Sequence, residues 1–166
     1  MFELKPLSIE AIPAALDKAV RYRLLNEPLQ AESICLDILT VDKKNQKALI
    51  TLLLALTDQF RHRLGGAFKE AQKAVSRLED DYQRSYYKGI IAERRADMHR
   101  TKDVPGSSHA AYGWYRRAME TYEKAAKIRP AGNDESILRW NTCARILIRH
   151  PELKPAPEDT FVPLLE

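Results

Sequence analysis

The chain has 166 residues, a hydrophobic fraction of 45%, a charged fraction of 30% and a net charge of +4 at pH 7, with a pI near 9.1. This length suits one compact domain with a continuous core and is hardly enough for two. The composition excludes the disordered class of proteins. The mild positive charge favours acidic partners, but it falls short of the concentrated basic stripe of a dedicated nucleic-acid binder.

The sequence predicts neither a secretory signal nor a membrane span. Its first residues, MFELKPLSIEA, lack the basic start and long apolar run of a signal peptide. The longest apolar run, residues 49–56 interrupted by Thr51, is too short to cross a bilayer. Cys35 and Cys143 lie far apart in apolar helical patterns, so we expect buried free thiols rather than a disulfide. Together these features predict a cytoplasmic protein.

The first two predicted helices are delimited by local signals. Ser8 is a plausible N-cap for a helix that runs to about residue 25, and Pro13 fits this helix only within its first turn. Asn26 can take the left-handed conformation that ends a helix, and Pro28 suits the first position of the next one. We expect this second helix to end near Val41.

The third and fourth helices are predicted around the glycine pair at residues 65–66. The third begins after a cap at Asn45 and runs from Gln46 to about Phe60. Because it is apolar nearly all round, it should be covered on several sides and lie in the middle of the fold. The glycine pair is expected to break the chain, so that the fourth helix covers residues 67–78.

Three further helices are predicted in the second half. Asp80 caps a long fifth helix that reaches about His99, and the clearest loop of the chain follows at residues 103–108. The sixth helix lies within residues 112–130, where apolar and small residues follow a three-and-four spacing until Pro130. The seventh begins after a cap at residues 133–134 and stops before Pro151. No alternating strand pattern competes, so the sequence predicts an all-α protein of seven helices.

The sixth helix resembles the second helix of a tetratricopeptide repeat (TPR). The resemblance rests on Ala118, Tyr122, Ala125 and Pro130, with Gly89 at the small position of the helix before it. Residues that match the first repeat are Ala19, Tyr22 and Ala31, while the middle repeat keeps Ala71 but has Leu54 at its small position. The middle repeat also lacks the terminal proline, and the first has Lys43 near that position.

The repeat period is longer than the family's. Ala31, Ala71 and Ala118 are 40 and 47 residues apart, against about 34 in a TPR. We place the extra residues in the 61–66 turn and the 100–108 loop, between the helices of a pair. The resemblance then implies an α-solenoid of about three helix-turn-helix repeats over residues 1–150, closed by a capping seventh helix. The alternative is a generic antiparallel bundle with accidental alanine spacing.

Catalytic motifs are not found in the sequence. It contains no glycine-rich phosphate loop, no G-x-S-x-G, no H-E-x-x-H and no pair of C-x-x-C motifs. His99, Asp103 and His109 could approach one another around the long loop as metal ligands, although a histidine near a helix C-terminus more often interacts with the helix dipole or solvent. We predict no enzyme activity, cofactor or metal.

The resemblance implies a binding groove lined by the first helix of each pair, and hence a protein-protein interaction scaffold. Cationic side chains expected along those helices and the capping helix are Lys18, Arg21, Arg84, Lys88, Arg95, Arg145 and Arg149. Arg84, Lys88 and Arg95 share a helical face, and such cations would attract an acidic peptide or protein partner. Alternatively they are solvated charges neutralised by nearby Glu93 and Asp97. In the capping helix, Arg139 is expected to face water together with Arg145 and Arg149.

Two further hypotheses remain open. The proline-rich tail, residues 151–166, carries an apolar tip around Phe161 and Leu165 with acidic neighbours, so it could dock against this molecule or build a homodimer. The alternative interpretation is a tail that packs on the last helix or has no fixed structure. The alternative function is RNA binding by the basic surface, which needs accessible aromatic rings. Candidate rings are Tyr86, Tyr87, Tyr112, Trp114 and Tyr115.

Overall fold

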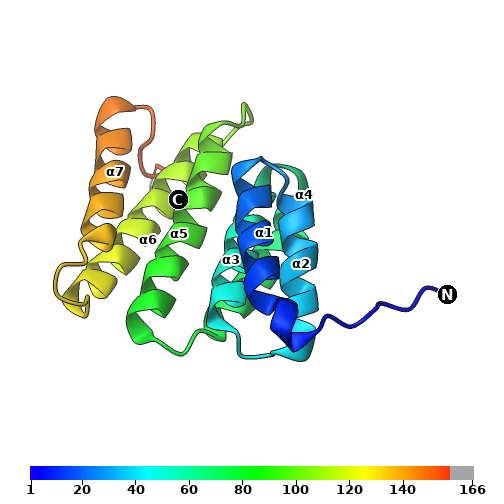
Figure 1. Ribbon diagram of the computed structural model, residues 1–166. Helices are drawn as coiled ribbons and strands as arrows, with labels where there is room; N and C mark the ends of the chain where they lie inside the picture. Colours follow the sequence, from blue (N-terminus) through cyan, green and yellow to red (C-terminus); the bar gives the residue numbers. More distant parts are fainter. Residues whose placement is uncertain (158–166) are drawn as a thin grey trace, which may run out of the picture.

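The protein is all-helical over the part of the chain that its computed structural model describes, residues 1–157, with the backbone alone for Leu64 (Figure 1). A single 3₁₀ turn, η1 (Ile9–Ala11), precedes seven α-helices in these residues. The helices are α1 (Ile12–Leu24), α2 (Pro28–Val41), α3 (Gln46–Thr57), α4 (Phe60–Ser76), α5 (Asp81–Arg100), α6 (Ser107–Lys127) and α7 (Glu135–Arg149). The predicted all-α class is therefore confirmed.

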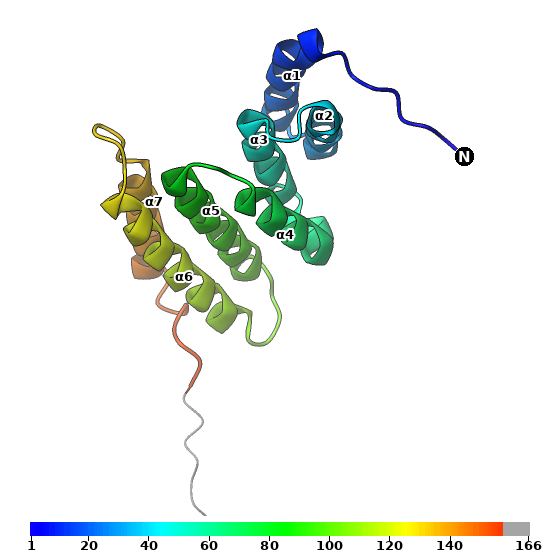
Figure 2. The ribbon, with the colours of Figure 1, turned by 90° about the horizontal axis from the view of Figure 1, so that it is seen from below.

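Each helix packs against its neighbours in sequence, and α3 also contacts α1 and α5. Figure 2 shows the helices following one another from α1 at one end to α7 at the other. The most extensive contact joins α5 to α6, and the α4–α5 contact is smaller than those within the flanking pairs. None of the helices in residues 1–157 combines the length and apolarity that a membrane crossing requires.

The buried side chains form two clusters. One is built around α3, mainly from residues of α1 to α4 together with Ile91 of α5, and it contains fully buried Leu49 and Leu53. As predicted, α3 is covered on several sides, by α1, α2, α4 and α5, but it lies in the middle of the first cluster and not of the whole fold. The other is formed by α5, α6 and α7 around Tyr115 and Tyr122. Leu54 packs against both clusters.

The two cysteines are free and fully buried, as predicted. Cys35 belongs to the first cluster and Cys143 to the second, so a disulfide between them is ruled out by the fold. Burial raises the pKa of Cys35 to about 12, and burial also raises the pKa of Cys143. Both thiols therefore act as small apolar core groups.

Most of the predicted helix boundaries are confirmed by backbone geometry. Asn26 has a φ of 60°, which places it in the left-handed region, and Pro28 is the first residue of α2. Pro13 lies in the first turn of α1, but Ser8 makes no side-chain capping bond. Asn45 caps α3 by accepting a hydrogen bond of 2.9 Å from the backbone N–H three residues on.

The second half shows one confirmed cap and one shifted boundary. Asp80 caps α5 by accepting a 2.7 Å hydrogen bond from the backbone N–H of Gln83. Helix α6 begins at Ser107, earlier than predicted, because Gly106 takes a φ of 81° and turns the chain into the helix. At α7, Asp134 makes no side-chain capping bond. Instead, the side-chain oxygen of Asn133 accepts a 3.1 Å hydrogen bond from the backbone N–H of Glu135.

The predicted break at the glycine pair is wrong. Gly65 and Gly66 lie inside α4, which begins at Phe60, and the non-helical backbone falls at Arg63, with φ −138° and ψ 38°. Among the described residues, no atom of another part of the protein lies within 4 Å of a Cβ built on either glycine. The turn that was expected to hold the extra residues of the middle repeat is therefore mostly helical.

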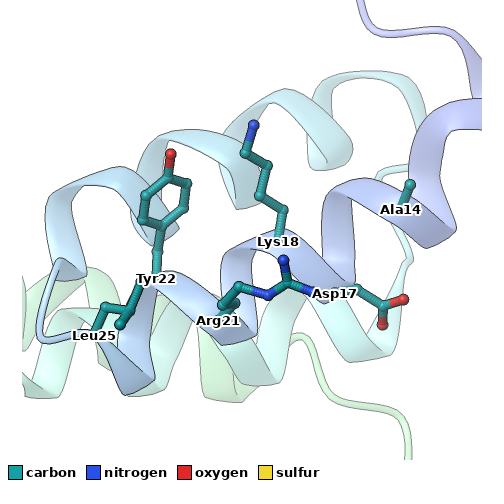
Figure 3. A pocket seen from close by; sticks show the side chains of 6 residues that line it. All are labelled: Ala14, Asp17, Lys18, Arg21, Tyr22 and Leu25. Atoms are coloured by element: carbon teal, nitrogen blue, oxygen red, sulfur yellow. The ribbon is translucent and has the colours of Figure 1, made fainter.

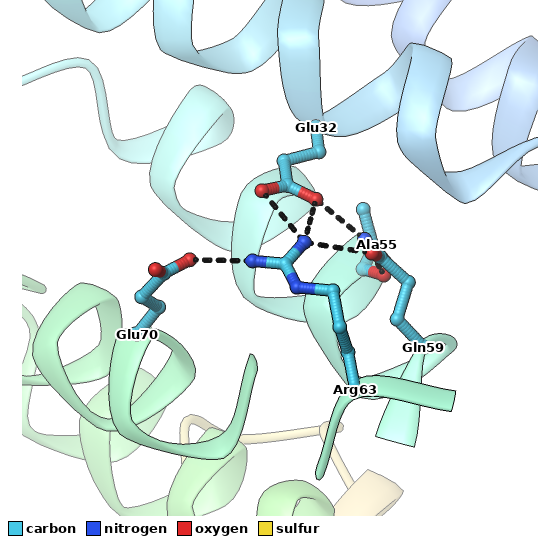
Figure 4. A network of polar contacts seen from close by, with 5 residues as sticks. All are labelled: Glu32, Ala55, Gln59, Arg63 and Glu70. Carbon is cyan, nitrogen blue, oxygen red and sulfur yellow. Dashed lines mark hydrogen bonds and ion pairs between the residues drawn. The ribbon is translucent and has the colours of Figure 1, made fainter. Parts of the chain in front are cut away.

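A polar network explains where the kink falls (Figure 4). Glu32 of α2 is 9% exposed and accepts hydrogen bonds from Gln59 Nε2 at 2.6 Å and from Arg63 Nη1 at 3.0 Å. Arg63 Nη2 also donates to Glu70 at 3.3 Å, one turn beyond the glycines. Because these partners lie on both sides of the kink, they hold the arginine out of helical register.

The predicted close approach of α5 and α6 at Gly89 is confirmed. A Cβ on this glycine would collide with the ring of Tyr122, which is fully buried. The Tyr122 hydroxyl donates a 2.6 Å hydrogen bond to Glu93, itself only 3% exposed. Arg139 of α7 donates to the same carboxylate at 2.9 Å. The prediction that Arg139 faces water is therefore wrong, because it joins α7 to the other two helices.

The C-terminal segment is described only as far as Pro157. After α7 ends, Leu153 is buried against the second cluster, and the carbonyl oxygen of Lys154 lies 3.0 Å from His109 Nδ1. These contacts hold residues 153–154 beside the start of α6. The docking prediction for the tip around Phe161 and Leu165 falls on residues outside the described part of the chain.

Candidate functional site

A groove runs between α4, α5 and α6 and has a volume of about 260 Å³. We call it the α5 groove. It is lined by Phe68, Gln72 and Val75 of α4, by Lys88, Ile91 and Ala92 of α5, and by Trp114, Arg117 and Thr121 of α6. These residues share a helical periodicity on each helix, so three regular elements position the walls of the groove rather than a mobile loop.

Arg95 lies beside the groove, in contact with two aromatic residues that line it. Its guanidinium lies between two aromatic rings, 4.1 Å from the centroid of Phe68 and 4.2 Å from that of Trp114. The two rings also contact each other edge to face, with centroids 5.7 Å apart. Arg117 approaches the Trp114 ring at 5.2 Å. Cation–π contacts of this kind hold a guanidinium in place without neutralising its charge.

The cations of the groove have no acidic counterpart among residues 1–157. No carboxylate in that part of the chain forms an ion pair with Lys88, Arg95 or Arg117. Arg95 Nε is buried and has no hydrogen-bond partner there. Burial lowers the pKa of Arg95, and the charge of Arg117 lowers it further.

The two acids that could have neutralised these cations are engaged elsewhere. Glu93 pairs with Arg139 and accepts from Tyr122, on the side of α5 that faces α6 and α7. Asp97 accepts from the hydroxyl of Tyr115. Neither acid therefore forms an ion pair with Lys88 or Arg95, although Lys88 is exposed to solvent.

The structure separates the seven cations that the sequence singled out. Lys88 lines the α5 groove, and Arg95 lies beside it against Phe68 and Trp114. Lys18 and Arg21 line a different hollow of about 530 Å³ along α1 (Figure 3). There Lys18 Nζ lies 6.0 Å from the ring centroid of Tyr22, and Asp17 adds an acidic group to the same hollow.

The remaining three predicted residues lie outside both hollows. Arg84 shares the α5 face of Lys88 and Arg95, but its guanidinium turns back to Asp81 and to the carbonyl oxygen of Leu78. It therefore fastens the start of α5 to the end of the preceding turn. Arg145 and Arg149 are exposed on α7.

The histidines do not form a metal site in the described residues. No group of three or more His, Cys, Asp or Glu side chains in residues 1–157 is arranged to hold a metal ion. His109 contacts the Lys154 carbonyl, and His150 Nδ1 lies 2.8 Å from Glu152. Burial lowers the pKa of His99, and the charges of Arg95 and Lys102 lower it further.

The sequence reasoning missed most of the groove. Trp114 was considered only as a ring for base stacking, and Arg117 and Phe68 were not singled out. The signal available in the sequence was the three-residue spacing of Trp114 and Arg117 on one helix, which places an aromatic ring and a cation side by side. The contribution of Phe68 depends on how α4 packs, and no local pattern contains that information.

Comparison of the chain with protein-family models, with curated proteins and with solved structures gives no match.

Proposed function

We propose that this protein is a non-catalytic, cytoplasmic interaction scaffold that binds an acidic segment of a partner protein in the α5 groove. The observation that carries the proposal is the cluster of Lys88, Arg95 and Arg117, three cations that no carboxylate of residues 1–157 pairs with. Like charges held close together repel one another, and a carboxylate from outside would relieve this repulsion. The positive charge at the groove therefore favours the binding of an acidic ligand.

The lining of the groove favours a peptide over a bare anion. Val75, Ile91 and Ala92 give it apolar surface, and Gln72 and Thr121 add neutral hydrogen-bonding groups. An acidic segment with an aliphatic side chain next to its carboxylates would use both kinds of surface. Charge-assisted hydrogen bonds to guanidinium groups would supply orientation, and apolar burial would supply affinity.

The RNA-binding alternative has less support. Base stacking requires open aromatic faces, whereas Phe68 and Trp114 are in contact with Arg95 and with each other. Tyr115 is fully buried, and Tyr86 stacks with Tyr82, so neither offers a free ring. A protein ligand fits this arrangement better.

We also propose a TPR-like architecture for the scaffold. Sequential helix pairs, the contacts from α1 to α3 and from α3 to α5, and the small residue at Gly89 all support it. The α5 groove differs from the expected location in one respect. It opens between the second helices of two pairs, α4 and α6, and not along a surface shared by α1, α3 and α5.

The test uses the two tryptophans of the full chain as separate reporters. Trp114 lines the groove, while the indole N–H of Trp140 donates to Glu123 at the α6–α7 contact. A short synthetic peptide of glutamate and leucine is titrated into ¹⁵N-labelled protein, and both indole resonances are followed. We expect a saturable shift of the Trp114 signal and none of the Trp140 signal.

Two double variants with equal changes in charge complete the test. Lys88→Glu with Arg117→Glu should weaken peptide binding roughly tenfold or more, because two attractions become repulsions. Arg145→Glu with Arg149→Glu alters exposed cations of α7 and should leave the affinity unchanged. Equal loss in both variants would show only non-specific attraction. A single-stranded RNA that shifts Trp114 more tightly than the peptide would favour the alternative function.

A further inference from the structure

A second hollow lies where the C-terminal ends of α1 and α3 meet the start of α4 and the C-terminal half of α5. Its volume is about 350 Å³, and it lies apart from the α5 groove and shares no lining residue with it. Its charged lining residues are Arg23, Asp58, Arg61, Arg94, Asp97 and Arg100. We propose that this hollow, called here the arginine pocket, binds a phosphate monoester through Arg61 and Arg94.

Both acidic residues of the pocket are already paired within the protein. Arg23 donates to Asp58 through two nitrogens, at 2.8 and 3.3 Å. Asp97 accepts from the Tyr115 hydroxyl, and Arg100 Nη2 lies 3.9 Å from the same carboxylate. Arg100 also donates to the Tyr115 oxygen at 3.1 Å. These contacts account for two of the four guanidinium groups.

Arg61 and Arg94 are the two that remain. Neither forms an ion pair with any carboxylate of residues 1–157. Arg61 is exposed, whereas Arg94 Nε is buried without a hydrogen-bond partner. The neighbouring Glu93 does not satisfy it, because its oxygens are bound by Tyr122 and Arg139. Arg94 therefore lines the pocket without an acidic partner among residues 1–157, and an oxyanion bound there would be its counterion.

Charge decides which oxyanion fits. Two unpaired guanidinium groups carry two positive charges, and a phosphate monoester carries about −1.5 to −2 at pH 7. A single carboxylate would leave one of the arginines uncompensated. Guanidinium forks also match the spacing of phosphate oxygens and bind them in a bidentate manner.

The helix ends at the pocket oppose this attraction without reversing it. α1, α3 and α5 all end here, each with the equivalent of about half a negative charge at its C-terminus, and the N-terminus of α4 adds about half a positive charge. These partial charges fall off within about one turn and pair with neither guanidinium, so they weaken the attraction without removing it. The site is therefore expected to bind weakly and to lose affinity as salt is raised.

The chain offers a built-in reporter and reference for this site. Met98 lines the arginine pocket and is 2% exposed, whereas Met119 lies in the core cluster of α5 to α7. Protein labelled with ¹³C at the methionine methyl groups is titrated with O-phosphoserine and, separately, with inorganic phosphate. Serine and sodium chloride at matched ionic strength serve as controls. The two phosphate arms distinguish a phosphorylated side chain from free phosphate as the source of the group.

We expect O-phosphoserine to shift the Met98 methyl signal saturably and to leave Met119 unchanged. Arg61→Gln and Arg94→Gln should each weaken binding roughly tenfold, since each removes charge-assisted hydrogen bonds. Arg61 is exposed, so its variant keeps the fold even if the Arg94 variant is destabilised. Arg145→Gln with Arg149→Gln is the matched control and should bind as the wild type does.

Two results would overturn the assignment. One is the lack of a saturable Met98 shift with either phosphate probe. The other is undiminished binding in Arg61→Gln. If Lys88→Gln with Arg117→Gln abolished phosphate binding while Arg61→Gln kept it, the phosphate would bind in the α5 groove and the arginine pocket would be excluded. That outcome would leave the acidic-segment proposal standing, so the two ideas fail separately.

Discussion

Replacement of Gly89 by alanine tests the packing of α5 on α6 directly. In an exposed helix, alanine is more favourable than glycine by about 1 kcal/mol. Here the new Cβ would overlap the Tyr122 ring, with Cδ1 at 2.6 Å and Cζ at 3.0 Å. Contacts between real Cβ atoms and their neighbours are longer than this, so either the ring or the helix must move.

The ring of Tyr122 has little freedom to move away. It is fully buried, and its hydroxyl is bound to Glu93 at 2.6 Å. Overpacking at such a site costs about 1–3 kcal/mol, which outweighs the gain in helix propensity. We therefore expect Gly89→Ala to lower the free energy of unfolding by up to about 2 kcal/mol.

The matched control is Gly113→Ala on α6. Gly113 is exposed, and a Cβ built there meets no atom within 4 Å. This change should raise the free energy of unfolding by about 0.5–1 kcal/mol. Urea unfolding followed by far-ultraviolet circular dichroism measures both variants. If Gly89→Ala were as stabilising as Gly113→Ala, the close approach of α5 and α6 at Gly89 would be wrong.

Three further predictions concern buried polar groups and thiols. Glu93→Ala should lower the free energy of unfolding by about 3 kcal/mol. This is the low end for a broken buried ion pair, because the Arg139 side chain is 30% exposed. Urea unfolding measures the change, and a loss below about 1 kcal/mol would contradict the pairing. Burial raises the pKa of Glu93 above its ordinary 4.5, so the folded state holds a proton more tightly than the unfolded one. The stability of the wild type relative to Glu93→Gln should therefore be greatest below about pH 4.5 and fall as the pH rises from there through the raised pKa. An increase over that range would show the opposite shift. Cys35 and Cys143, whose pKa values are raised by burial, should resist alkylation at pH 8 in the folded protein and react in urea; rapid reaction without urea would contradict their burial.

The sequence predicted the helices well because their signals are local. Asn45 and Asp80 cap the helix ends that they precede, and Asn26 turns the chain at a left-handed position. The glycine pair at residues 65–66 gave a wrong prediction of a helix break, because the position of the kink depends on a contact with a residue distant in sequence. Glu32, on another helix, holds Arg63 and fixes the kink beside it. A rule that considers only neighbouring residues cannot include that contact.

The same limit applies to the candidate site. Lys88 and Arg95 were placed on one face by their spacing, and the structure keeps them together. Arg84 was placed on that face too, but its long side chain bends back to Leu78 and Asp81. Spacing along a helix fixes the direction of a Cβ atom and not the position of a guanidinium. Phe68 and Arg117 complete the groove only because three helices meet there.

The two core clusters meet at a boundary within the molecule, and the α5 groove lies across that boundary. Phe68 packs on the cluster of α1 to α4, and Trp114 packs on the cluster of α5 to α7. The Arg95 guanidinium lies between the two rings and contacts both. A ligand that fills the groove would contact both clusters and restrict their motion relative to each other. Amide hydrogen exchange should therefore slow in α4 as well as in α6 when the acidic peptide binds. The interaction surface would then also control how stiff the whole helical array is.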